Sequence, residues 1–590
     1  MEREEFLKIY RHSMAHILAK AVIEIFGKEN VQYAIGPQID DGFYYDFQLP
    51  RMLTKEDHKP IEDKMREILK RKEDWVRKEV TREEALEIFS DQKFKKELIE
   101  ELPPDEKITV YYTGDDYVDL CAGPHIENSQ ELLGAAFQIR SISGAYWRGD
   151  ENRDQLQRIY CYCYPDKKAL KEHLALVKEA MERDHKKLGP ELDLFMFDPT
   201  APGMPYWLPD GLAVYNALQD FWRREHELHG YKEIAAPVLN ERQLWITSGH
   251  WAHYKDNMFL APVDDDRVFA VKPMNCPNAI MVYKRGQRSY RELPLRISEM
   301  DVIHRKEKSG ELNGLFRVQE FRQDDAHTFL MNEQIADEIG DIMDIAEKIY
   351  GTFGLTYRAE LSTRPDDFMG DIEVWNQAEA SLKAILDDKY GEGNYAINEG
   401  DGAFYGPKID LQMKDCLGRE WQMGTIQLDF QLPLNFDLSY VASDGTHQRP
   451  VLIHRAIFGS MERFIGILIE NFKGAFPFWL APKQVGIVPI RPEHNEYARK
   501  VADKLYENRI RFDARYENEH MRLKIKNFKQ HKVPYVIILG DNEAEKETVS
   551  INLRGGNRKL QDVPLDKFIQ MCRTMNLEHS LELIDEVPED

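Results

Sequence analysis

The sequence predicts a multidomain protein that combines α+β and α/β domains. Its 590 residues exceed what one hydrophobic core holds, so about three to four domains are expected. Residues 191–480 alternate strand-like runs with long helical stretches, a pattern typical of an antiparallel sheet flanked by helices. Residues 481–590 alternate short apolar runs with an amphipathic helix, which indicates a smaller α/β domain with a mainly parallel sheet.

The composition is that of a globular protein without a membrane segment. No run of apolar residues is long enough to span a bilayer, and the charged N-terminus lacks the apolar core of a signal peptide. We therefore expect a cytoplasmic protein, in which the six cysteines are buried, catalytic or metal-bound thiols. The net charge of -24 argues against nonspecific nucleic-acid binding but leaves room for local basic patches.

A connecting helix is expected between the first and second large domains. Leu170, Leu174, Val177 and Met181 follow helical spacing, and Gly189-Pro190 is expected to end the helix. This divides the chain into residues 1–165, a linker at 166–190, a central domain at 191–480 and a final domain at 481–590.

The most informative stretch is residues 295–327, in which two strand-like runs flank a polar, glycine-containing loop. Arg305 and Glu307 share one face of the first run. The second run places five residues on one face by the two-residue period of a strand: Arg317, Phe321, Gln323, Asp325 and His327. A face that gathers cations, an aromatic ring, an amide, a carboxylate and an imidazole indicates a ligand site, although a surface hairpin with a salt-bridge ladder is the alternative.

This stretch resembles motif 2 of the class II aminoacyl-tRNA synthetases, which implies an antiparallel-sheet catalytic core that binds ATP. By that resemblance Arg305 binds the α-phosphate, Glu307 faces the adenine, Phe321 stacks on it, and Arg317 also binds ATP. A guanidinium suits the negative charge that builds up at phosphorus during attack by a carboxylate. Magnesium is expected to accompany the ATP phosphates.

Two further segments are similar to motifs of the same family. Gly459-Ser460 opens a helix that carries Arg463, which by resemblance to motif 3 contacts the γ-phosphate and is catalytic together with Arg305 and Lys408. Residues 229–245 resemble motif 1, in which Pro237 lies at a dimer interface. The resemblance therefore implies a homodimer formed through the catalytic domain.

A candidate metal centre is implied only by the resemblance, because Cys276, His327 and His454 are too widely separated for a zinc-finger pattern. The segments KPMNCP, QDDAH and IHRAIFGSMERF are similar to those that carry the zinc ligands of threonyl-tRNA synthetases. One Zn²⁺ per subunit, with coordination positions left open, would separate threonine from the nearly isosteric valine by recognising its hydroxyl group.

The same resemblance implies further pocket residues along 274–427. ATP-binding roles fall on Gln422 and Thr425. Threonine-binding roles fall on Met274, Gln323, Asp325, Tyr405 and Gln427. The alternating polar residues Gln427, Asp429 and Gln431 indicate a strand that faces a ligand, and an exposed edge strand is the alternative.

The N-terminal block predicts a second, hydrolytic site. His12 and His16 are spaced i, i+4 on one helix face, and Cys121 and His125 flank a Gly-Pro turn, which is metal-like spacing. The block resembles the editing domain of threonyl- and alanyl-tRNA synthetases, which places Lys95 and Asp119 at editing positions. Removal of mischarged serine would be needed because serine also carries a hydroxyl group. Whether this site holds a metal stays open, as does a helix with two incidental histidines. Because the sequence begins almost at this block, the resemblance implies a form that lacks the small domain which usually precedes it in the family.

The final domain resembles the anticodon-binding domain of class IIa synthetases. Glu543 in GDNEAE and Arg554 in INLRGG are the candidate anticodon contacts. The segment NEHMRLKI (518–525) departs from the family pattern, because Arg522 stands where a glycine is usual. A charged, solvated loop is the alternative at this end of the chain.

The resemblance implies a ligase that activates threonine with ATP, transfers it to the 3′ end of tRNA(Thr) and hydrolyses mischarged Ser-tRNA(Thr). Two other classes of protein remain as alternatives. One is a synthetase-like RNA-binding or regulatory protein that charges no tRNA, and the other is an editing hydrolase fused to a non-catalytic body. Both predict a broken ATP or zinc site, whereas Arg305, Arg463 and the three candidate zinc ligands are all present.

Overall fold

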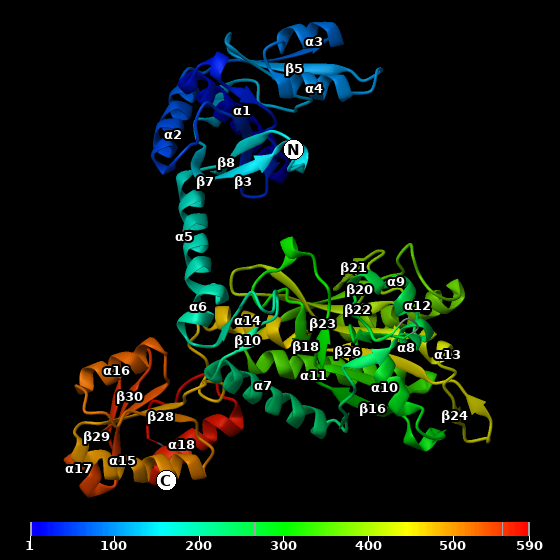
Figure 1. Cartoon of the computed structure of the whole chain (residues 1–590), viewed down its shortest axis with the longest axis vertical. Coiled ribbons are helices and arrows are strands. Elements are labelled where there is room, and N and C mark those ends of the chain that lie inside the picture. The colour runs from blue at the N-terminus through cyan, green and yellow to red at the C-terminus, as the bar shows by residue number, and fades with distance from the viewer. Residues whose placement is uncertain (1–2, 265–266, 557, 588–590) are drawn as a thin grey trace. The chain divides into compact units, whose positions relative to one another are not determined.

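The computed structural model of the chain describes residues 3–264, 267–556 and 558–587. It separates into two units, residues 1–179 and 180–590, which are described in turn (Figure 1). No helix within the described residues is long and apolar enough to cross a membrane.

The first unit is built around the long helix α1 (Arg3–Phe26), which contacts α2 and β3. Met14, Leu18 and Val22 recur every four residues, so they lie on one buried face of α1 within the core of this unit. One antiparallel sheet runs β1-β3-β8-β7 with β2 beside β3, and a second runs β4-β5-β6. The remaining helices are α2 (Lys55–Lys70), α3 (Arg82–Ile88) and α4 (Lys93–Glu101). The strands are β1 (Gln32–Tyr33), β2 (Gln38–Ile39), β3 (Gly42–Gln48), β4 (Trp75–Val80), β5 (Ile108–Thr113), β6 (Tyr117–Leu120), β7 (Ala136–Tyr146) and β8 (Gln155–Tyr164).

The predicted linker helix is two helices, α5 (Lys167–Arg183) and α6 (His185–Glu191). The break falls at Asp184, whose side chain caps α6 by accepting a hydrogen bond from the Lys186 N–H. The prediction that Gly189-Pro190 ends the helix was wrong, because both residues lie inside α6.

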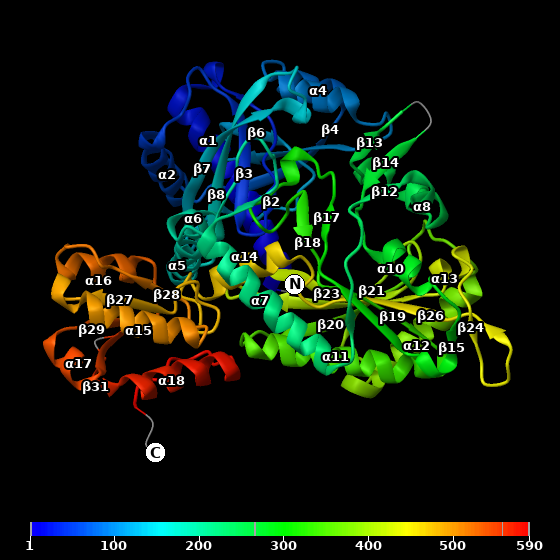
Figure 2. The same cartoon turned by 60° about the horizontal axis from the view of Figure 1, so that its bottom comes forward.

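The second unit contains a large, mostly antiparallel sheet in the order β11-β16-β19-β26-β23-β22-β20-β21. Its apolar side chains, such as Ile409, Ile426 and Ile453, share a core cluster with Ile342 of α11 and Leu382 of α12. Figure 2 shows α11 and α12 beneath these strands and the small hairpin β17–β18 above them. The sheet strands are β11 (Lys232–Glu233), β16 (Leu295–Glu299), β19 (Asp325–Leu330), β20 (Tyr357–Ser362), β21 (Ala396–Asn398), β22 (Lys408–Lys414), β23 (Glu420–Asp429) and β26 (Val451–Ala456).

Helices and short strands surround this sheet. The helices are α7 (Pro209–Leu228), α8 (Arg242–Thr247), α9 (His250–His253), α10 (Cys276–Tyr283), α11 (Ile335–Thr352), α12 (Ile372–Tyr390), α13 (Gln431–Asn435) and α14 (Met461–Asn471). The short strands are β9 (Phe195–Met196), β10 (Tyr206–Trp207), β12 (Leu239–Glu241), β13 (Leu260–Pro262), β14 (Val268–Val271), β15 (Arg288–Ser289), β17 (Val302–His304), β18 (Glu320–Arg322), β24 (Tyr440–Val441) and β25 (His447–Gln448).

The hairpin predicted over 295–327 is present, but it is divided between two sheets. Its base, β16 with β19, belongs to the large sheet, and its tip, β17 with β18, forms a separate pair. The single second strand that the two-residue period predicted therefore breaks at residues 323–324. Likewise, Gln431 begins α13 instead of continuing β23. Since β23 pairs with both β22 and β26, the edge-strand alternative is excluded.

The C-terminal sheet has the order β28-β27-β29-β30-β31 and its own core. The expected parallel character holds only in part, because β27 is parallel to β28 and β29, whereas β29–β30 and β30–β31 are antiparallel. The elements are β27 (Val485–Pro489), α15 (Asn495–Glu507), β28 (Phe512–Ala514), α16 (Met521–Gln530), β29 (Tyr535–Leu539), α17 (Asp541–Lys546), β30 (Thr548–Leu553), β31 (Lys559–Pro564) and α18 (Leu565–Glu578).

Candidate active site

A cavity of about 320 Å³ lies between the hairpin β17–β18, strand β23 and the start of α14. All the residues that the sequence predicts for ATP line it. The lining comprises Arg305, Glu307, Phe316, Arg317, Val318, Phe321, Gln323, Gln422, Met423, Thr425, Gly459, Ser460 and Arg463. Residues from four separate stretches of the chain therefore meet in one place.

Three guanidinium groups give this cavity its electrostatic character. Arg317 pairs with Glu307 at 2.8 Å, whereas Arg463 donates to the carbonyl oxygens of Phe316 and Gln422 at 3.0 and 3.2 Å. Burial lowers the pKa of Arg463, and the charges of Arg305 and Arg317 lower it further. Among the described residues the side chain of Arg463 bonds only to neutral carbonyls, and a cation held in this way near two others favours an anionic ligand such as a polyphosphate.

The hairpin also supplies an aromatic wall. The Arg305 guanidinium carbon lies 5.2 Å from the centre of the Phe321 ring, and its Nε donates to the Pro273 carbonyl at 3.2 Å. These contacts hold Arg305 between the hairpin and the segment that leads into α10. Phe321 is nearly buried and still lines the cavity, so a flat base has a ring to stack on.

The register of the large sheet explains why polar residues far apart in sequence share its open face. His327 is paired with His454, His454 with Gln427, and Gln427 with Lys408. Directly paired residues point to the same side of a sheet, so these side chains form one row. Residues two positions further along, among them Asp325 and Thr425, extend the same face. The intervening residues are the apolar ones that pack toward α11 and α12.

Asp410 organises the row next to Lys408. This fully buried carboxylate accepts hydrogen bonds from Lys408 Nζ at 2.6 Å, from Gln422 Nε2 at 2.6 Å and from Thr425 Oγ1 at 3.0 Å. Ser362 Oγ donates to it as well, at 2.7 Å. The predicted residues Lys408, Gln422 and Thr425 are thus fixed by a carboxylate that the sequence analysis did not single out. The sequence feature that could have identified Asp410 is a charged residue at an inward-facing position of a strand.

Cys276, His327 and His454 come together as a candidate metal centre. One ligand atom from each lies within 4.8 Å of the others, and all three residues are buried. Cys276 begins α10, and the two histidines are neighbours on β19 and β26. The Nδ1 atoms of both histidines are buried without a hydrogen-bond partner, which is the state of a nitrogen available to a metal. Burial lowers the pKa of His327 and keeps that ring in its neutral, metal-binding form.

Carboxylates surround these three residues. His454 Nε2 lies 2.8 Å from Asp429 Oδ2, and a metal-bound histidine commonly donates its other ring nitrogen in this way. His327 Nδ1 lies 3.8 Å from Glu299 Oε1. Burial raises the pKa of Asp325 to about 6, while a 2.7 Å hydrogen bond from Asn275 opposes that rise. Glu299 and Asn275 were not identified from the sequence, whereas Asp429 was noted as one of the alternating polar residues of its strand.

The other predicted threonine-binding residues lie around the same three residues. The Tyr405 ring centre is 5.2 Å from that of His454, and Gln427 is paired with His454 on the sheet. Met274 precedes Cys276 by two residues, and its sulfur lies 3.1 Å from His250 Nε2. Gln323 lines the ATP cavity and bridges to Ser460. These residues therefore gather next to the ATP cavity, whose lining includes Gln323.

The first unit brings its own predicted residues together. One ligand atom from each of His12, His16, Cys121 and His125 lies within 4.8 Å of the rest. Cys121 Sγ is 3.4 Å from His12 Nε2 and 3.3 Å from His125 Nε2. Burial lowers the pKa of all three histidines and raises that of Cys121 to about 11. Neutral imidazoles and a thiol can bind a metal or can hold and deprotonate a water molecule.

Asp119 anchors the floor of this second site. It pairs with Lys95 and lies 3.4 Å from His16 Nε2. Two tyrosine hydroxyls donate to its Oδ2, Tyr45 at 2.6 Å and Tyr117 at 2.9 Å. Lys95, Asp119 and His16 are each about 2% exposed, so this is a buried polar network and not a surface cluster. The incidental-histidine alternative does not explain such a network.

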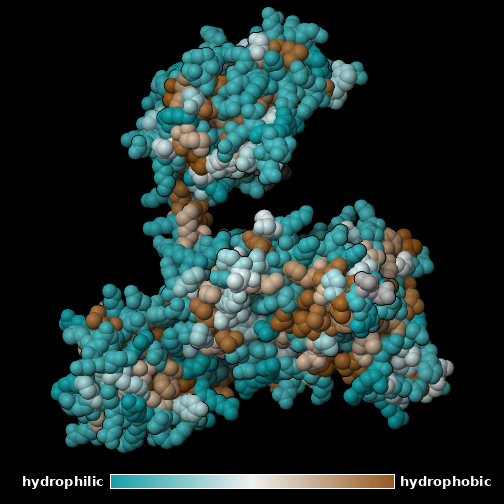
Figure 3. Space-filling view, viewed as in Figure 1, coloured by the Kyte–Doolittle hydropathy of each residue, from teal (hydrophilic) through white to brown (hydrophobic). Residues whose placement is uncertain are grey.

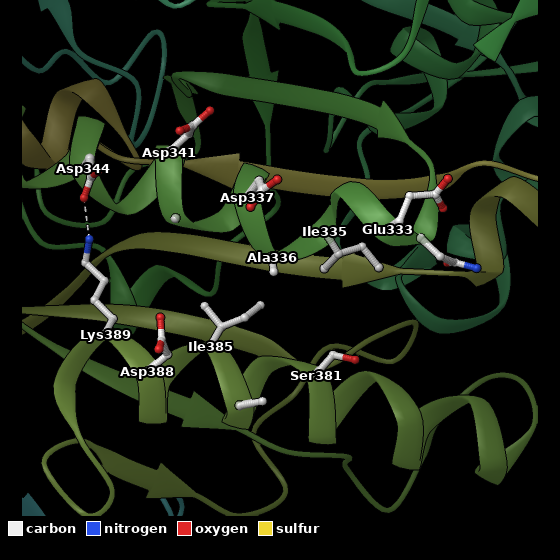
Figure 4. Close-up of a pocket in the computed structure, with 13 residues that line it drawn as sticks. Glu333, Ile335, Ala336, Asp337, Asp341, Asp344, Ser381, Ile385, Asp388 and Lys389 are labelled. Carbon is white, nitrogen blue, oxygen red and sulfur yellow. Dashed lines mark hydrogen bonds and ion pairs between the residues drawn. The ribbon is translucent and has the colours of Figure 1, made fainter. Parts of the chain in front are cut away.

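A larger groove, of about 770 Å³, lies between α11 and α12. Figure 4 shows Asp337, Asp341 and Asp344 along one wall and Asp388 and Lys389 on the other, with Lys389 paired to Asp344. None of the residues predicted from the sequence lines it. Its acidic lining disfavours a phosphate ligand, so the smaller cavity remains the candidate site.

The two candidate anticodon residues are held by bonds within the chain. Glu543 accepts hydrogen bonds from the Gly540 N–H at 2.9 Å and from Ser550 Oγ at 2.6 Å. Arg554 donates to the carbonyl oxygens of Lys532 and Phe476, and burial lowers its pKa to about 10. Arg554 therefore ties the C-terminal sheet to the catalytic body. Nothing in this geometry tests an anticodon contact, which stays a prediction for both residues.

Three family models match the chain. The tRNA synthetase class II core domain (G, H, P, S and T) matches residues 259–472, a range that contains every residue predicted for ATP, threonine and zinc. The anticodon binding domain matches residues 484–575. The threonyl and alanyl tRNA synthetase second additional domain matches residues 108–160, which include Asp119, Cys121 and His125.

Curated relatives match over almost the full chain. The threonine–tRNA ligase of Syntrophomonas wolfei subsp. wolfei is 49% identical over 94% of this chain and 86% of its own length. The threonine–tRNA ligase of Thermotoga petrophila is 48% identical over 99% of this chain and 91% of its own length. The chain belongs to the threonine–tRNA ligase family.

Solved structures of the same family agree with this assignment. The RNA binding domain of threonyl-tRNA synthetase from Cryptosporidium parvum Iowa II is 40% identical, with a TM-score of 0.64, and covers 66% of this chain and 98% of that chain. The putative threonyl-tRNA synthetase ThrRS-1 from Aeropyrum pernix is 27% identical, with a TM-score of 0.56, and covers 68% of this chain and 98% of that chain.

Proposed function

We propose that this chain is a working threonine–tRNA ligase. Threonine's carboxylate attacks the α-phosphate of ATP to give threonyl-adenylate and pyrophosphate, and the acyl group then passes to the 3′ end of tRNA(Thr). The observation that carries the proposal is the arginine-lined cavity adjoining the buried Cys276, His327 and His454 cluster. The alternatives without charging activity predict that one of these two sites is broken.

Each wall of the cavity suits one part of the nucleotide. Arg305 and Arg463 would hold the phosphates, with Mg²⁺ accompanying them, and would offset the charge that develops at the α-phosphorus. Phe321 would stack on the adenine, and Glu307, held by Arg317, would accept from its amino group. Lys408 shares Asp410 with Gln422 and Thr425 of the cavity lining, and it would add a further cation near the reacting carboxylate.

Zinc fits the residues at the second subsite. Cys276, His327 and His454 would hold one ion, since they present a thiol and two buried ring nitrogens without partners. Bound there, it would supply a Lewis acid that takes the amino and hydroxyl groups of threonine, which valine cannot match. Asp325 would accept from the hydroxyl group, and Tyr405 and Gln427 would close the pocket around its methyl group.

The first unit would remove serine attached in error. A pocket that selects a hydroxyl group rejects serine only by a missing methyl, which is worth roughly 1–3 kcal/mol. His12, His16, Cys121 and His125 would bind and deprotonate the water that attacks the ester, while Lys95 and Asp119 fix their orientation. The three histidines and the cysteine could hold this water either through a metal ion or by direct hydrogen bonds.

The remaining assignments complete the proposal. The proposed parts are an editing domain at 1–165, a linker at 166–190, a catalytic domain at 191–480 and an anticodon-binding domain at 481–590.

A homodimer through the catalytic domain is supported by exposed apolar side chains near Pro237, including Val238, Leu239, Ile246 and Met281. Figure 3 shows apolar side chains gathered on this body. The partners are tRNA(Thr), ATP and threonine in the cytoplasm.

The deciding experiment is ATP–pyrophosphate exchange with threonine, serine, valine and proline in turn. We expect strong exchange with threonine, weaker exchange with serine, and little with valine or proline. An absence of threonine-dependent exchange by a folded, zinc-loaded protein would contradict the proposed function.

A further inference from the structure

His185, the first residue of α6, has both ring nitrogens engaged in the interior of the second unit. Its Nδ1 lies 2.7 Å from Glu470 Oε1, and its Nε2 accepts from the Leu315 backbone N–H at 3.0 Å. Because a backbone N–H can only donate, Nε2 carries no proton and Nδ1–H is the donor to Glu470. The side chain is only 1% exposed, so water does not compete for either bond.

This arrangement is a bridge and not a metal site. Asp184, His185 and Glu470 are close enough to hold an ion, but both nitrogens of His185 are already used. Glu470 also pairs with Arg419, which in turn pairs with Asp415 at 2.6 Å. Burial opposes ionisation of Glu470, yet the bond from His185 and the charge of Arg419 hold its pKa below the ordinary value. The carboxylate is therefore ionised and fully partnered.

The bridge joins three segments around the ATP cavity. Leu315 lies in the loop between β17 and β18, and Glu470 lies in the last turn of α14, whose first turn carries Arg463. Phe316, the next residue of the loop, packs its ring on His185 with centres 4.1 Å apart. The carbonyl of Phe316 accepts from Arg463 Nε at 3.0 Å, and both residues line the cavity. His185 thus supports the segment that orients Arg463.

The loop between β17 and β18 has a backbone conformation that lets Leu315 reach His185. Gly314 has a φ of 52°, and a Cβ atom at that position would lie 2.3 Å from His185 Nε2 and 2.7 Å from Lys186 Cγ. A side chain would therefore push the loop away from the imidazole. Only glycine gives Leu315 access to His185 without strain.

We propose that His185 is a positioning residue for ATP. It holds the loop between β17 and β18 against α14, so that Phe316 and Arg463 are fixed before the nucleotide binds. The residue touches no substrate and acts through Leu315 and Glu470. This inference rests on the proposed function, because ATP must be the ligand of the cavity.

The test compares variants in threonine-dependent ATP–pyrophosphate exchange, measuring KM for ATP and for threonine separately. We expect His185→Ala to raise KM for ATP about tenfold, or about 1.4 kcal/mol, and to leave KM for threonine within about twofold. His185→Gln places an acceptor near the position of Nε2 and should recover most of the ATP affinity. His185→Asn keeps only the donor to Glu470 and should resemble His185→Ala. Lys187→Ala, an exposed neighbour on α6, is the matched control.

A double-mutant cycle with Gly314→Ala separates positioning from general destabilisation. Gly314→Ala alone should also raise KM for ATP, because its methyl group collides with the imidazole. In the His185→Ala background the collision with the imidazole is absent, whereas the contact with Lys186 Cγ and the positive φ remain, so the combined effect should be smaller than the sum of the two. Additive effects, equal rises in both KM values, or rescue by Asn and not by Gln would each overturn the proposal. If His185→Ala does not fold, Gly314→Ala and the Gln–Asn pair still decide it. Loss of exchange by the unaltered protein would instead refute the proposed function.

Discussion

At the scale of single residues, the proposed zinc subsite is supported by polar atoms that lack a hydrogen-bond partner as much as by the contacts that are present. Cys276 is buried among carboxylates, and two buried imidazole nitrogens have no partner within the described residues. Buried polar atoms are rarely left unpaired in native proteins, so the cluster calls for a ligand. Asp429 already holds the far side of His454, as an outer partner of a metal ligand does.

Replacement of Cys276 tests this subsite. Cys276→Ser should lose most bound zinc, because a hydroxyl group is a far weaker zinc ligand than a thiolate, and threonine activation should fall by at least about a hundredfold. Metal content by mass spectrometry and pyrophosphate exchange check the two effects together. Cys416→Ser, at an exposed cysteine of the same body, serves as the control. Full threonine activation by a zinc-free Cys276→Ser protein would refute the proposed role of the metal.

Residue-level prediction worked where side-chain direction follows from strand period. His327, Gln427 and Lys408 reach one face because the large sheet pairs them in register. Alternation along the strand predicted this for His327 and Gln427, whereas Lys408 was implied only by the resemblance. It could not find Asp410 or Glu299. Their importance comes from the side chains that surround them, and most of these belong to other segments of the chain.

At the scale of elements, the start of α14 places Arg463. Ser460 caps the helix by accepting from the Arg463 N–H at 3.2 Å, and Gly459 adopts a φ of 66° in the preceding turn. A Cβ on Gly459 would meet the Met423 carbonyl oxygen at 2.5 Å. The turn therefore requires Gly459 and the cap requires Ser460, in agreement with the helix start predicted at this pair.

Loss of this cap should affect stability and nucleotide binding together. Ser460→Ala should cost about 1 kcal/mol of stability and raise KM for ATP several-fold, since the backbone of Arg463 loses its anchor. Ser460→Thr keeps a capping oxygen and should restore much of both. Thermal unfolding and pyrophosphate exchange measure the two quantities, with Ser443→Ala in an exposed loop as the control. An unchanged KM for ATP in Ser460→Ala would show that the cap does not orient Arg463.

Element boundaries were the least predictable feature. The hairpin over 295–327 is divided between two sheets, and the linker helix breaks at Asp184 instead of at Gly189-Pro190. Both breaks occur where the chain meets another segment: Asp324 accepts from the backbone N–H groups of Ile457 and Gly459, and His185 meets Glu470. The local helix and strand propensities of the sequence do not reveal contacts between residues that are distant along the chain.

At the scale of the whole molecule, the two proposed sites belong to different units. Every predicted editing residue lies within residues 1–179, and every residue predicted for ATP, threonine and zinc lies within 180–590. Each unit also has its own hydrophobic core. The two activities should therefore be separable by mutation.

Reciprocal variants test this separation. His16→Ala should abolish hydrolysis of Ser-tRNA(Thr), because it removes the ring beside Asp119, while threonine activation stays within about twofold. Arg463→Ala should lose activation by at least about a hundredfold and keep hydrolysis. Deacylation of preformed Ser-tRNA(Thr) and pyrophosphate exchange measure the two reactions independently. Loss of both activities in either variant, with the fold intact, would contradict two independent sites.

The sequence by itself determined the family, the fold class and the identity of most candidate site residues. The fold class follows from strand and helix periods, whereas the family and most of the site residues follow from the resemblance of short motifs to those of a known family. Only the tertiary structure decided how those motifs are held together. Asp410 orients three predicted residues, Asp429 braces His454, and His185 connects the linker to the ATP cavity. Arg554, whose predicted anticodon contact stays untested, donates a hydrogen bond to the Phe476 carbonyl. Such bonds join residues that are distant in sequence, so their energies depend on the packed fold and not on local pattern.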